Sequence, residues 1–192
     1  MRVNVRQRQL ELKIVYYGPG LSGKTTNLAW LHQRLPQTAR GSLVQLDTEG
    51  ERTLFFDYFP YELGTCGDYG IKVDFFTVPG QSFYQATRRA VLDGVDGIVF
   101  VADSDPERED ANVLAREDME SSLAVRGRRL QEVPHVYQWN KRDLPNAVPC
   151  KVLDRVLNPE GAASLPAVAS SGEGVLEAQD ILLQEVLDRV GT

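Results

Sequence analysis

The 192-residue sequence lacks most of the marks of secreted, membrane-spanning and metal-rich proteins. Its two cysteines, Cys66 and Cys150, are too few for a disulfide framework, so we expect two reduced thiols. No apolar run approaches the roughly 20 residues that span a bilayer, and we expect no integral membrane segment. No Cys/His cluster surrounds either histidine, which argues against a zinc site.

Positive charge is also scarce. The chain has 21 Lys and Arg against 27 Asp and Glu, a formal net charge of −6. This balance argues against broad electrostatic binding to nucleic acid or to an anionic membrane. The N-terminal residues lack the apolar stretch of a secretory signal, residue 2 is Arg, and the last residues contain no prenylation cysteine. We therefore expect a cytoplasmic protein whose membrane contacts come through partners or a surface patch.

Strand-like and helix-like segments alternate along the whole chain, without repeats or linkers. Apolar and β-branched runs predict strands at 10–17, 54–59, 71–78, 97–102, 133–139 and 165–169. Amphipathic spacing predicts helices at 24–35, 109–127, 148–157 and 175–190. Alternation of this kind predicts an α/β fold, with a mainly parallel central sheet and helices on both faces, in one domain over residues 1–192. Ligands of such sheets lie at the carboxyl ends of the strands.

The segment GPGLSGKT after the first strand matches G-x-x-x-x-G-K-[ST] at every fixed position. Its glycines let successive N–H groups face one point, and the start of the following helix adds partial positive charge. Lys24 is expected to reach the β- and γ-phosphates, and the Thr25 hydroxyl to bind Mg²⁺. The residues predicted to bind phosphate are Gly18, Gly20, Leu21, Ser22, Gly23, Lys24, Thr25 and Thr26.

The segment Asn140-Lys141-Arg142-Asp143 matches N-K-x-D, a guanine-reading pattern, and follows a predicted strand. Asp143 can accept hydrogen bonds from N1–H and the exocyclic amine of guanine, which adenine cannot supply. Asn140 is expected at N7, and the stem of Lys141 along the base plane. Farther on, VASSGEGV resembles a loop that closes over guanine, where Ala169 would offer its N–H to O6; a plain turn is the alternative.

The segment TVPGQ after the third predicted strand resembles the D-x-x-G-Q element of Ras-like proteins, with Thr77 in place of Asp. Gly80 would offer its N–H to the γ-phosphate, and Gln81 would orient the attacking water, unless it is only an exposed loop residue. The missing Asp normally holds Mg²⁺ through a water. We therefore expect weaker Mg²⁺ binding or help from another carboxylate, for which Asp103 is not a preferred candidate.

The long polar stretch 38–53 occupies the place of a first switch loop. Such a loop needs a Thr whose hydroxyl meets Mg²⁺ and whose N–H senses the γ-phosphate. Thr48 and Thr53 compete for this role, and we favour Thr53. Arg52 beside it is a candidate arginine finger, with an ordinary surface arginine as the alternative; arginine fingers contribute about 10³–10⁵ in kcat.

The segments GPGLSGKTTN, RTLFFD, TVPGQ, GVDGIVFVADS and NKRDLPNAV together resemble the MglA-type bacterial small GTPases. TVPGQ in place of D-x-x-G-Q is itself a trait of that group. The resemblance implies a three-layer P-loop NTPase G domain, a GTP/GDP switch with Mg²⁺, and catalytic or sensing roles for Arg52, Thr53 and Gln81. It also implies a dimeric MglB-like roadblock-domain GTPase-activating partner, effector proteins, and a role in cell polarity or motility with recruitment to a cell pole or membrane.

Two other functions compete with a GTP-hydrolysing switch. A non-hydrolysing nucleotide-gated scaffold would account for Thr77 and for the uncertain arginine finger. An ATP-using P-loop kinase is disfavoured by Asp143 and by the lack of an Arg-rich lid-like insertion. Phosphate release over many turnovers separates the first alternative from a GTPase, and competition by ATP tests the second.

Overall fold

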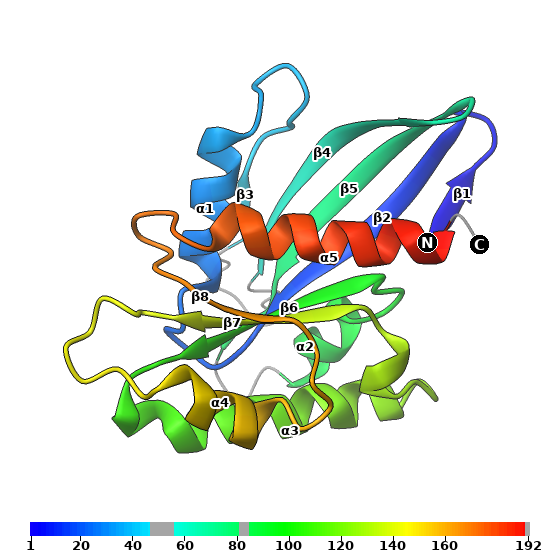
Figure 1. Cartoon of the computed structure of the whole chain (residues 1–192). Helices are drawn as coiled ribbons and strands as arrows, with labels where there is room; N and C mark the ends of the chain where they lie inside the picture. The colour runs from blue at the N-terminus through cyan, green and yellow to red at the C-terminus, as the bar shows by residue number, and fades with distance from the viewer. Residues whose placement is uncertain (47–55, 81–84, 191–192) are drawn as a thin grey trace.

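The computed structural model describes residues 1–46, 56–80 and 85–190 of the chain (Figure 1). Within these ranges the strands are β1 (Arg2–Asn4), β2 (Gln9–Tyr17), β3 (Val44–Leu46), β4 (Phe56–Cys66), β5 (Tyr69–Thr77), β6 (Gly97–Asp103), β7 (His135–Asn140) and β8 (Ser164–Pro166). The α-helices are α1 (Lys24–Arg34), α2 (Gln85–Val91), α3 (Glu109–Ala124), α4 (Cys150–Leu157) and α5 (Val175–Val190). Two 3₁₀ turns, η2 (Pro106–Arg108) and η3 (Leu130–Glu132), precede α3 and β7.

All of these strands join one sheet in the order β3-β4-β5-β2-β6-β7-β8, with β1 added beside β2. β2 lies parallel to both β5 and β6, and β6, β7 and β8 continue the parallel part. β4 runs antiparallel between β3 and β5, and its hairpin with β5 extends away from the helices (Figure 1). The sheet is therefore mainly parallel with an antiparallel flank, as the sequence predicts apart from that flank.

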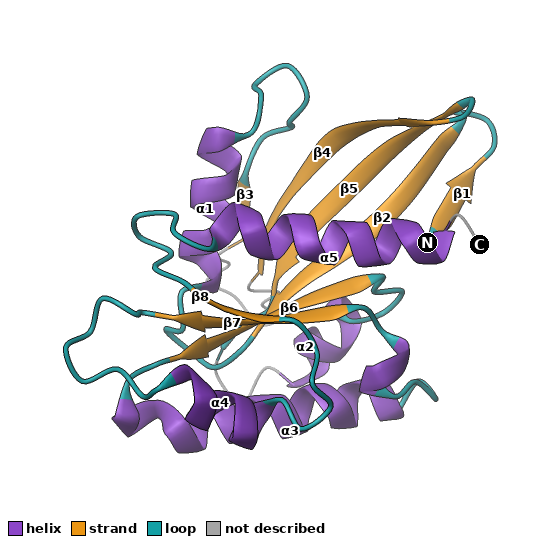
Figure 2. Ribbon diagram, viewed as in Figure 1, coloured by secondary structure: helices purple, strands orange, loops and turns teal. Residues whose placement is uncertain are grey.

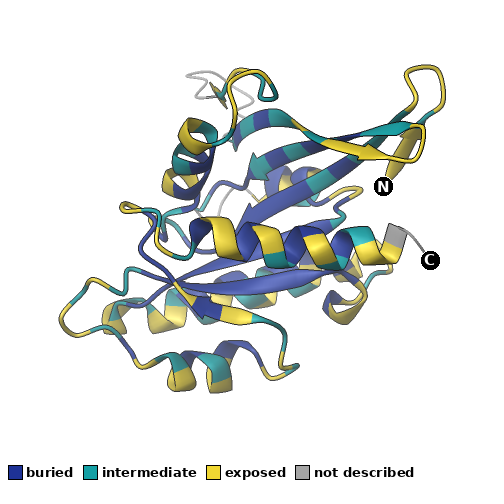
Figure 3. Ribbon diagram, turned by 45° about the horizontal axis from the view of Figure 1, so that its top comes forward, coloured by how far each residue is buried: buried dark blue, intermediate teal, exposed yellow. Residues whose placement is uncertain are grey.

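Helices cover both faces of the sheet, which gives three layers (Figure 2). Alternate residues of β2 enter two separate cores: Ile14 and Tyr16 pack with α1 and α5, while Val15 and Tyr17 pack with α2, α3 and α4. β6 is buried along its whole length because both of its faces are covered (Figure 3). A continuous apolar run such as GIVFVA is typical of a strand in this position.

Three features of the fold were not predicted. The short strands β1 and β3 and the seven-residue helix α2 have too little periodic pattern to stand out, and α2 buries Arg88 and Thr87 among its few inward residues. β4 continues to Cys66 although Pro60 and Gly64 suggest an earlier end. The pairing of β4 with β3 ends at Tyr58, before Pro60. On this edge of β4 the next N–H, that of Glu62, donates to Ala39, which lies outside β3. Pro60 is tolerated because no β3 residue there needs its missing N–H.

No helix within the described ranges is long and apolar enough to cross a membrane.

Candidate nucleotide-binding site

The glycine-rich loop lies at the carboxyl edge of the sheet, between β2 and α1. β2 is followed along the chain by β3, β4 and β5 on one side of it, whereas β6 leads to β7 and β8 on the other side. Connections that diverge from two adjacent strands leave a crevice outside their carboxyl ends, where ligands of open α/β sheets bind. The predicted phosphate loop and the predicted base loop, which follows β7, both open onto this edge.

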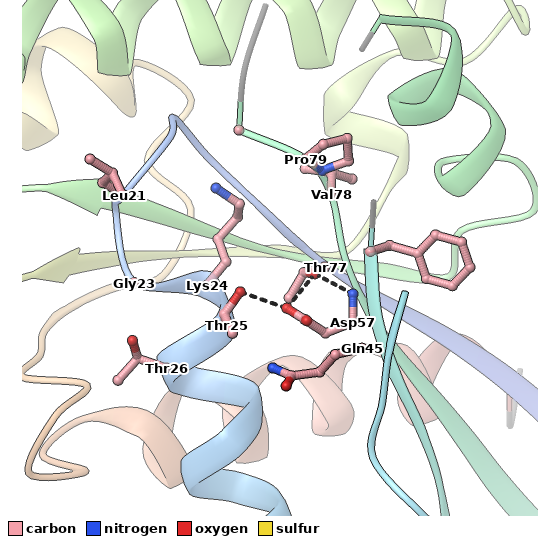
Figure 4. Close-up of a pocket in the computed structure, with 12 residues that line it drawn as sticks. Leu21, Gly23, Lys24, Thr25, Thr26, Gln45, Asp57, Thr77, Val78 and Pro79 are labelled. Atoms are coloured by element: carbon pink, nitrogen blue, oxygen red, sulfur yellow. Dashed lines mark hydrogen bonds between the residues drawn. The ribbon is translucent and has the colours of Figure 1, made fainter. Parts of the chain in front are cut away.

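The backbone of the phosphate loop requires its glycines. Gly18 and Gly23 have φ values of 143° and 101°, which other residues rarely adopt. A Cβ on Gly18 would lie 2.2 Å from the Val101 carbonyl oxygen, and one on Gly23 would lie 2.2 Å from Asn140 Nδ2. Leu21 also has a positive φ, 65°, and its side chain is exposed above the loop (Figure 4). The loop is thus held in a curled form in which β6 and the base loop pack closely against it.

Lys24 points into the cradle, where its ammonium group donates to the carbonyl oxygens of Gly18 (3.0 Å) and Pro19 (2.6 Å). The side chain is almost fully buried. Burial, followed by the nearby Arg88 guanidinium, lowers the pKa of Lys24 to about 7. Among the described residues, no carboxylate is hydrogen-bonded to this ammonium group. An anionic ligand would therefore stabilise its charge, and phosphate oxygens are such a ligand.

A carboxylate that the sequence did not single out lies beside Thr25. Asp57 Oδ2 accepts hydrogen bonds from the hydroxyls of Thr25 (2.6 Å) and Thr77 (2.9 Å), and the Asp57 N–H donates to Thr77 Oγ1 at 2.8 Å (Figure 4). In the antiparallel pairing of β4 with β5, Tyr58 is opposite Phe76, so Asp57 faces Thr77 one step further along. The only sequence signal was an acidic residue inside an aromatic strand, LFFDYF.

These oxygens suit a magnesium ion. Mg²⁺ binds through one or two protein oxygens, with water and phosphate oxygens completing its shell. The Thr25 hydroxyl and the Asp57 carboxylate offer oxygens of this kind, and both line a cavity of about 560 Å³ whose lining also includes Lys24, Thr77 and Gly80. Across the described parts of the chain, no cluster of three or more His, Cys, Asp or Glu side chains offers a metal site of another kind.

Gly80 packs directly against the phosphate loop. A Cβ on Gly80 would lie 2.3 Å from the Cα of Gly20, so the two backbones are too close for a side chain at residue 80. This contact brings the TVPG segment to the part of the loop where a terminal phosphate is expected. The predicted partners Thr48, Arg52, Thr53 and Gln81 lie outside the described residues, and their roles remain predictions.

Asn140 connects the predicted base loop to the phosphate loop. Its Nδ2 donates to the Ser22 carbonyl oxygen at 2.7 Å, and its Oδ1 accepts from the Ala169 N–H at 2.9 Å. Asn140 thus ties the phosphate loop to the loop of Ala169, and the Ala169 N–H, predicted for guanine O6, donates within the protein. Asp143 is exposed on the same loop, and Lys141 adopts a left-handed backbone conformation with φ 66°.

The second guanine-side loop packs on helix α1. An isolated bridge between Val168 and Glu173 closes this loop. Gly172, with φ 88°, lies against the indole ring of Trp30, where an added Cβ would be 1.8 Å from Cε2. The loop is therefore placed by an aromatic side chain of the helix that also begins at the phosphate loop, a contact that the sequence did not reveal.

Comparison with known proteins gives the family. No family model matches the chain. The "Mutual gliding-motility protein MglA" of Myxococcus xanthus (strain DK1622) is 44% identical over 185 residues, which cover 96% of this chain and 95% of that protein. The chain belongs to the MglA-type family of Ras-like small GTPases. As a member of this family it is a GTP hydrolase and a small GTPase switch, and the predicted resemblance of the chain to this family is confirmed.

More distant relatives are also small GTPases. The "ADP-ribosylation factor-like protein 2" of Drosophila melanogaster is 26% identical over 195 residues, 98% of this chain and 94% of that protein. The protein of the same name in Arabidopsis thaliana is 24% identical over 193 residues, 97% of this chain and 93% of that protein. The similarity thus extends over nearly the whole chain, including the antiparallel flank of the sheet.

Proposed function

We propose that this MglA-type protein binds GTP with Mg²⁺ in the crevice beside β2, hydrolyses it slowly alone, and does so faster with a GTPase-activating partner. The observation that supports this most directly is the Asn140 side chain, which bonds to the phosphate loop on one side and to the guanine-side loop on the other. A site with this link would hold phosphates and base at a fixed separation. A fixed separation of this kind suits a ligand that has both phosphates and a base, as a guanine nucleotide does.

At the phosphate end, Lys24 and the loop N–H groups would bind the β- and γ-phosphates, and Gly80 would offer its N–H near the γ-phosphate. At the base end, Asp143 would read guanine and Lys141 would lie along the base plane. The Ala169 N–H, which donates to Asn140 in this structure, would turn to O6 when guanine binds. Discrimination against adenine would arise because Asp143 would be left without its two donors. Loss of such polar pairing excludes a competing base far more strongly than a difference in apolar contact.

The metal would be held by Thr25 and Asp57. Thr77 occupies the position where Ras-like proteins have Asp, and it orients Asp57 through two hydrogen bonds. The carboxylate missing from β5 would thus be supplied from β4, by the residue that faces Thr77. When bound, Mg²⁺ would neutralise charge on the phosphate oxygens. Thr53 remains a predicted further ligand.

Catalysis would depend on residues of the two switch segments. Gln81 would orient the attacking water, and Arg52 would stabilise charge on the transferred phosphoryl group. An activator of the MglB-like roadblock type would accelerate this step, and effectors would bind the GTP form. By its resemblance to the family, we infer a role in cell polarity or motility, with recruitment to a cell pole by partners.

Nucleotide titration tests the binding proposal. Fluorescent GDP and GTP are added to the protein with Mg²⁺, ATP is used as competitor, and Asp143→Asn is compared with the protein as it is. Asp110→Asn, an exposed carboxylate at the start of α3, is the matched control. We expect tight guanine binding that ATP does not displace and that only Asp143→Asn weakens. Equal competition by ATP would refute guanine selectivity.

Hydrolysis is tested separately, by phosphate release over several turnovers with and without a roadblock-domain activator. We expect slow release alone and faster release with the activator. Binding without any release under either condition would instead favour the nucleotide-gated scaffold, the alternative to which Thr77 first points.

A further inference from the structure

A buried carboxylate lies between the two loops of the site and has no role in the function proposed above. Asp103 is the last residue of β6, the strand next to β2, and it has no exposed surface. Its backbone is held by Asn112 of α3, which accepts from the Asp103 N–H at 2.9 Å and donates to the Asp103 carbonyl at 2.8 Å. The position of Asp103 therefore does not depend on its own side chain.

Two cations from different segments approach this carboxylate. Lys141 Nζ of the base loop lies 2.6 Å from Asp103 Oδ2. Arg108 Nε, from the turn after β6, lies 3.9 Å from the same oxygen. Arg108 also extends its Nη2 to the carbonyl oxygen of Gly20, at 2.7 Å. One anion thus faces the residue expected along the base and the residue that holds the tip of the phosphate loop.

Asp103 is buried far more deeply than the two cations that approach it. The Asp103 side chain is fully buried, whereas those of Lys141 and Arg108 are about one-third exposed, at 35% and 36%. A buried charge is tolerated only when it is paired, and charge-assisted hydrogen bonds are the strong ones. The two flexible cationic side chains are therefore drawn to one fixed point, which restricts their conformations before any nucleotide binds.

We propose that Asp103 is a positioning residue of the nucleotide site: its carboxylate holds Lys141 in place for the base and Arg108 in place on the phosphate loop. One buried anion thereby sets the geometry of both loops. The inference rests on the proposed function, because it takes the base-reading role of Lys141 as given. It goes beyond that function because it assigns Asp103 and Arg108, which do not belong to the predicted nucleotide contacts.

Two measurements separate the two ends of this arrangement. The first is the rate of fluorescent GDP release, which reports on the base end. The second is the single-turnover rate of bound-GTP hydrolysis, which reports on the phosphate end and is independent of affinity. We expect Lys141→Met to speed GDP release, and Arg108→Gln to slow hydrolysis severalfold while changing GDP release less than about threefold. Asp103→Asn should show both effects, with GDP release about tenfold to a hundredfold faster, as expected for a lost charge-assisted hydrogen bond.

The control is Asp105→Asn, which removes one negative charge from the same turn. Asp105 caps η2 by accepting from the Glu107 N–H, a bond that an amide oxygen can also accept. It should leave both rates unchanged. If Asp103→Asn does not fold, Asp103→Ser replaces it, because a hydroxyl can still accept from the Asp105 N–H that bonds to Asp103 Oδ1.

A combined variant distinguishes positioning from general loosening. In the Lys141→Met background, Asp103→Asn should speed GDP release no further, since the cation on which it acts is gone. Independent, multiplying effects, or an Asp103 variant with the rates of the Asp105→Asn control, would overturn the inference and leave the proposed function intact. Failure of the unmodified protein to bind guanine nucleotides would overturn both.

Discussion

The contacts of Asp57 become visible only in the three-dimensional structure. It is separated from Thr25 by 32 positions and from Thr77 by 20, yet its carboxylate accepts a hydrogen bond from both hydroxyls. The sequence left open either weaker Mg²⁺ binding or help from another carboxylate, and it named Asp103 as a candidate that was not preferred, without considering Asp57. Asp103 instead faces Lys141 and Arg108. Which carboxylate faces Thr77 depends on the register of the antiparallel pair of β4 and β5, and neither strand's own sequence specifies that register.

We expect Asp57→Asn to weaken the binding of Mg²⁺ at the nucleotide site, so that more Mg²⁺ is needed to hold the nucleotide. The Mg²⁺ concentration that half-maximally slows GDP release should rise about tenfold or more, the size of effect found for residues that support metal ligands. Asp74→Asn is the control, because Asp74 pairs with Tyr58 and Lys72 rather than with Thr25. In the Asp57→Asn background, Thr77→Asp should restore the dependence by returning a carboxylate to the facing strand. An unchanged Mg²⁺ requirement in Asp57→Asn would contradict the assignment.

The two nucleotide loops are placed by the elements that follow and flank them. The phosphate loop and the base loop were predicted correctly in position because each directly follows a strand with a strong apolar pattern, β2 and β7. The long helices α3 and α5 and the buried strand β6 were also predicted, with ends within a few residues. The antiparallel extension of β4 was not predicted, because its pairing with β5 leaves no periodic apolar pattern in its own sequence. The helix α2 was not predicted either, because two of its few buried residues are polar.

The contact between Trp30 and Gly172 makes a prediction at the level of elements. Gly172→Ala would place a Cβ inside the indole ring, whereas Gly161→Ala, also at positive φ (71°), meets open space. We expect Gly161→Ala to cost about 1–2 kcal/mol of unfolding free energy from backbone strain alone. Gly172→Ala should cost about 1–3 kcal/mol more, from overpacking.

Denaturant unfolding measures both costs, and GDP release measures the consequence for the site. Only Gly172→Ala should speed GDP release, since only that change displaces the loop that carries Ala169. Equal effects of the two substitutions on stability and on release would show that Trp30 does not place this loop.

The stability of the whole molecule involves a polar network far along the sheet from the phosphate loop. The Glu160 carboxylate accepts from Tyr137 Oη at 2.6 Å and pairs with Arg116 at 2.8 Å and His135 at 3.2 Å, which ties α3, β7 and the segment after α4 together. Burial opposes ionisation of Glu160, but the Tyr137 hydrogen bond, its own backbone and the Arg116 guanidinium outweigh it and lower the pKa of the carboxyl. The ionised form is thus favoured in the folded protein.

A lowered carboxyl pKa predicts a definite dependence of stability on pH. The contribution of Glu160 is present above its unfolded pKa of about 4.3 and is lost as the pH falls through the folded value. Glu160→Gln should therefore lower the unfolding free energy at pH 7 by about 1–3 kcal/mol, and the difference should shrink below pH 4. Glu120→Gln is the control, because Glu120 pairs with the same Arg116 at the surface and such pairs contribute less than about 1 kcal/mol.

Denaturant titrations at several pH values check this expectation. A destabilisation by Glu160→Gln that is the same at pH 7 and pH 3.5 would show that the ionised carboxylate is not what stabilises the network.

The sequence by itself determined the glycine-rich G-x-x-x-x-G-K-T loop after β2, the N-K-x-D segment after β7 and the α/β alternation. Each depends on residues that are neighbours in the chain, so backbone conformation and local spacing are enough to specify it. Only the tertiary structure decided that the Asp57 carboxylate faces Thr25 and Thr77, that Asp103 lies between the phosphate loop and the loop of Asn140, and that Trp30 packs against the loop of Gly172. Those contacts join strands and helices whose pairing arises from the packing of the whole sheet, and no local pattern encodes which side chains that packing brings together.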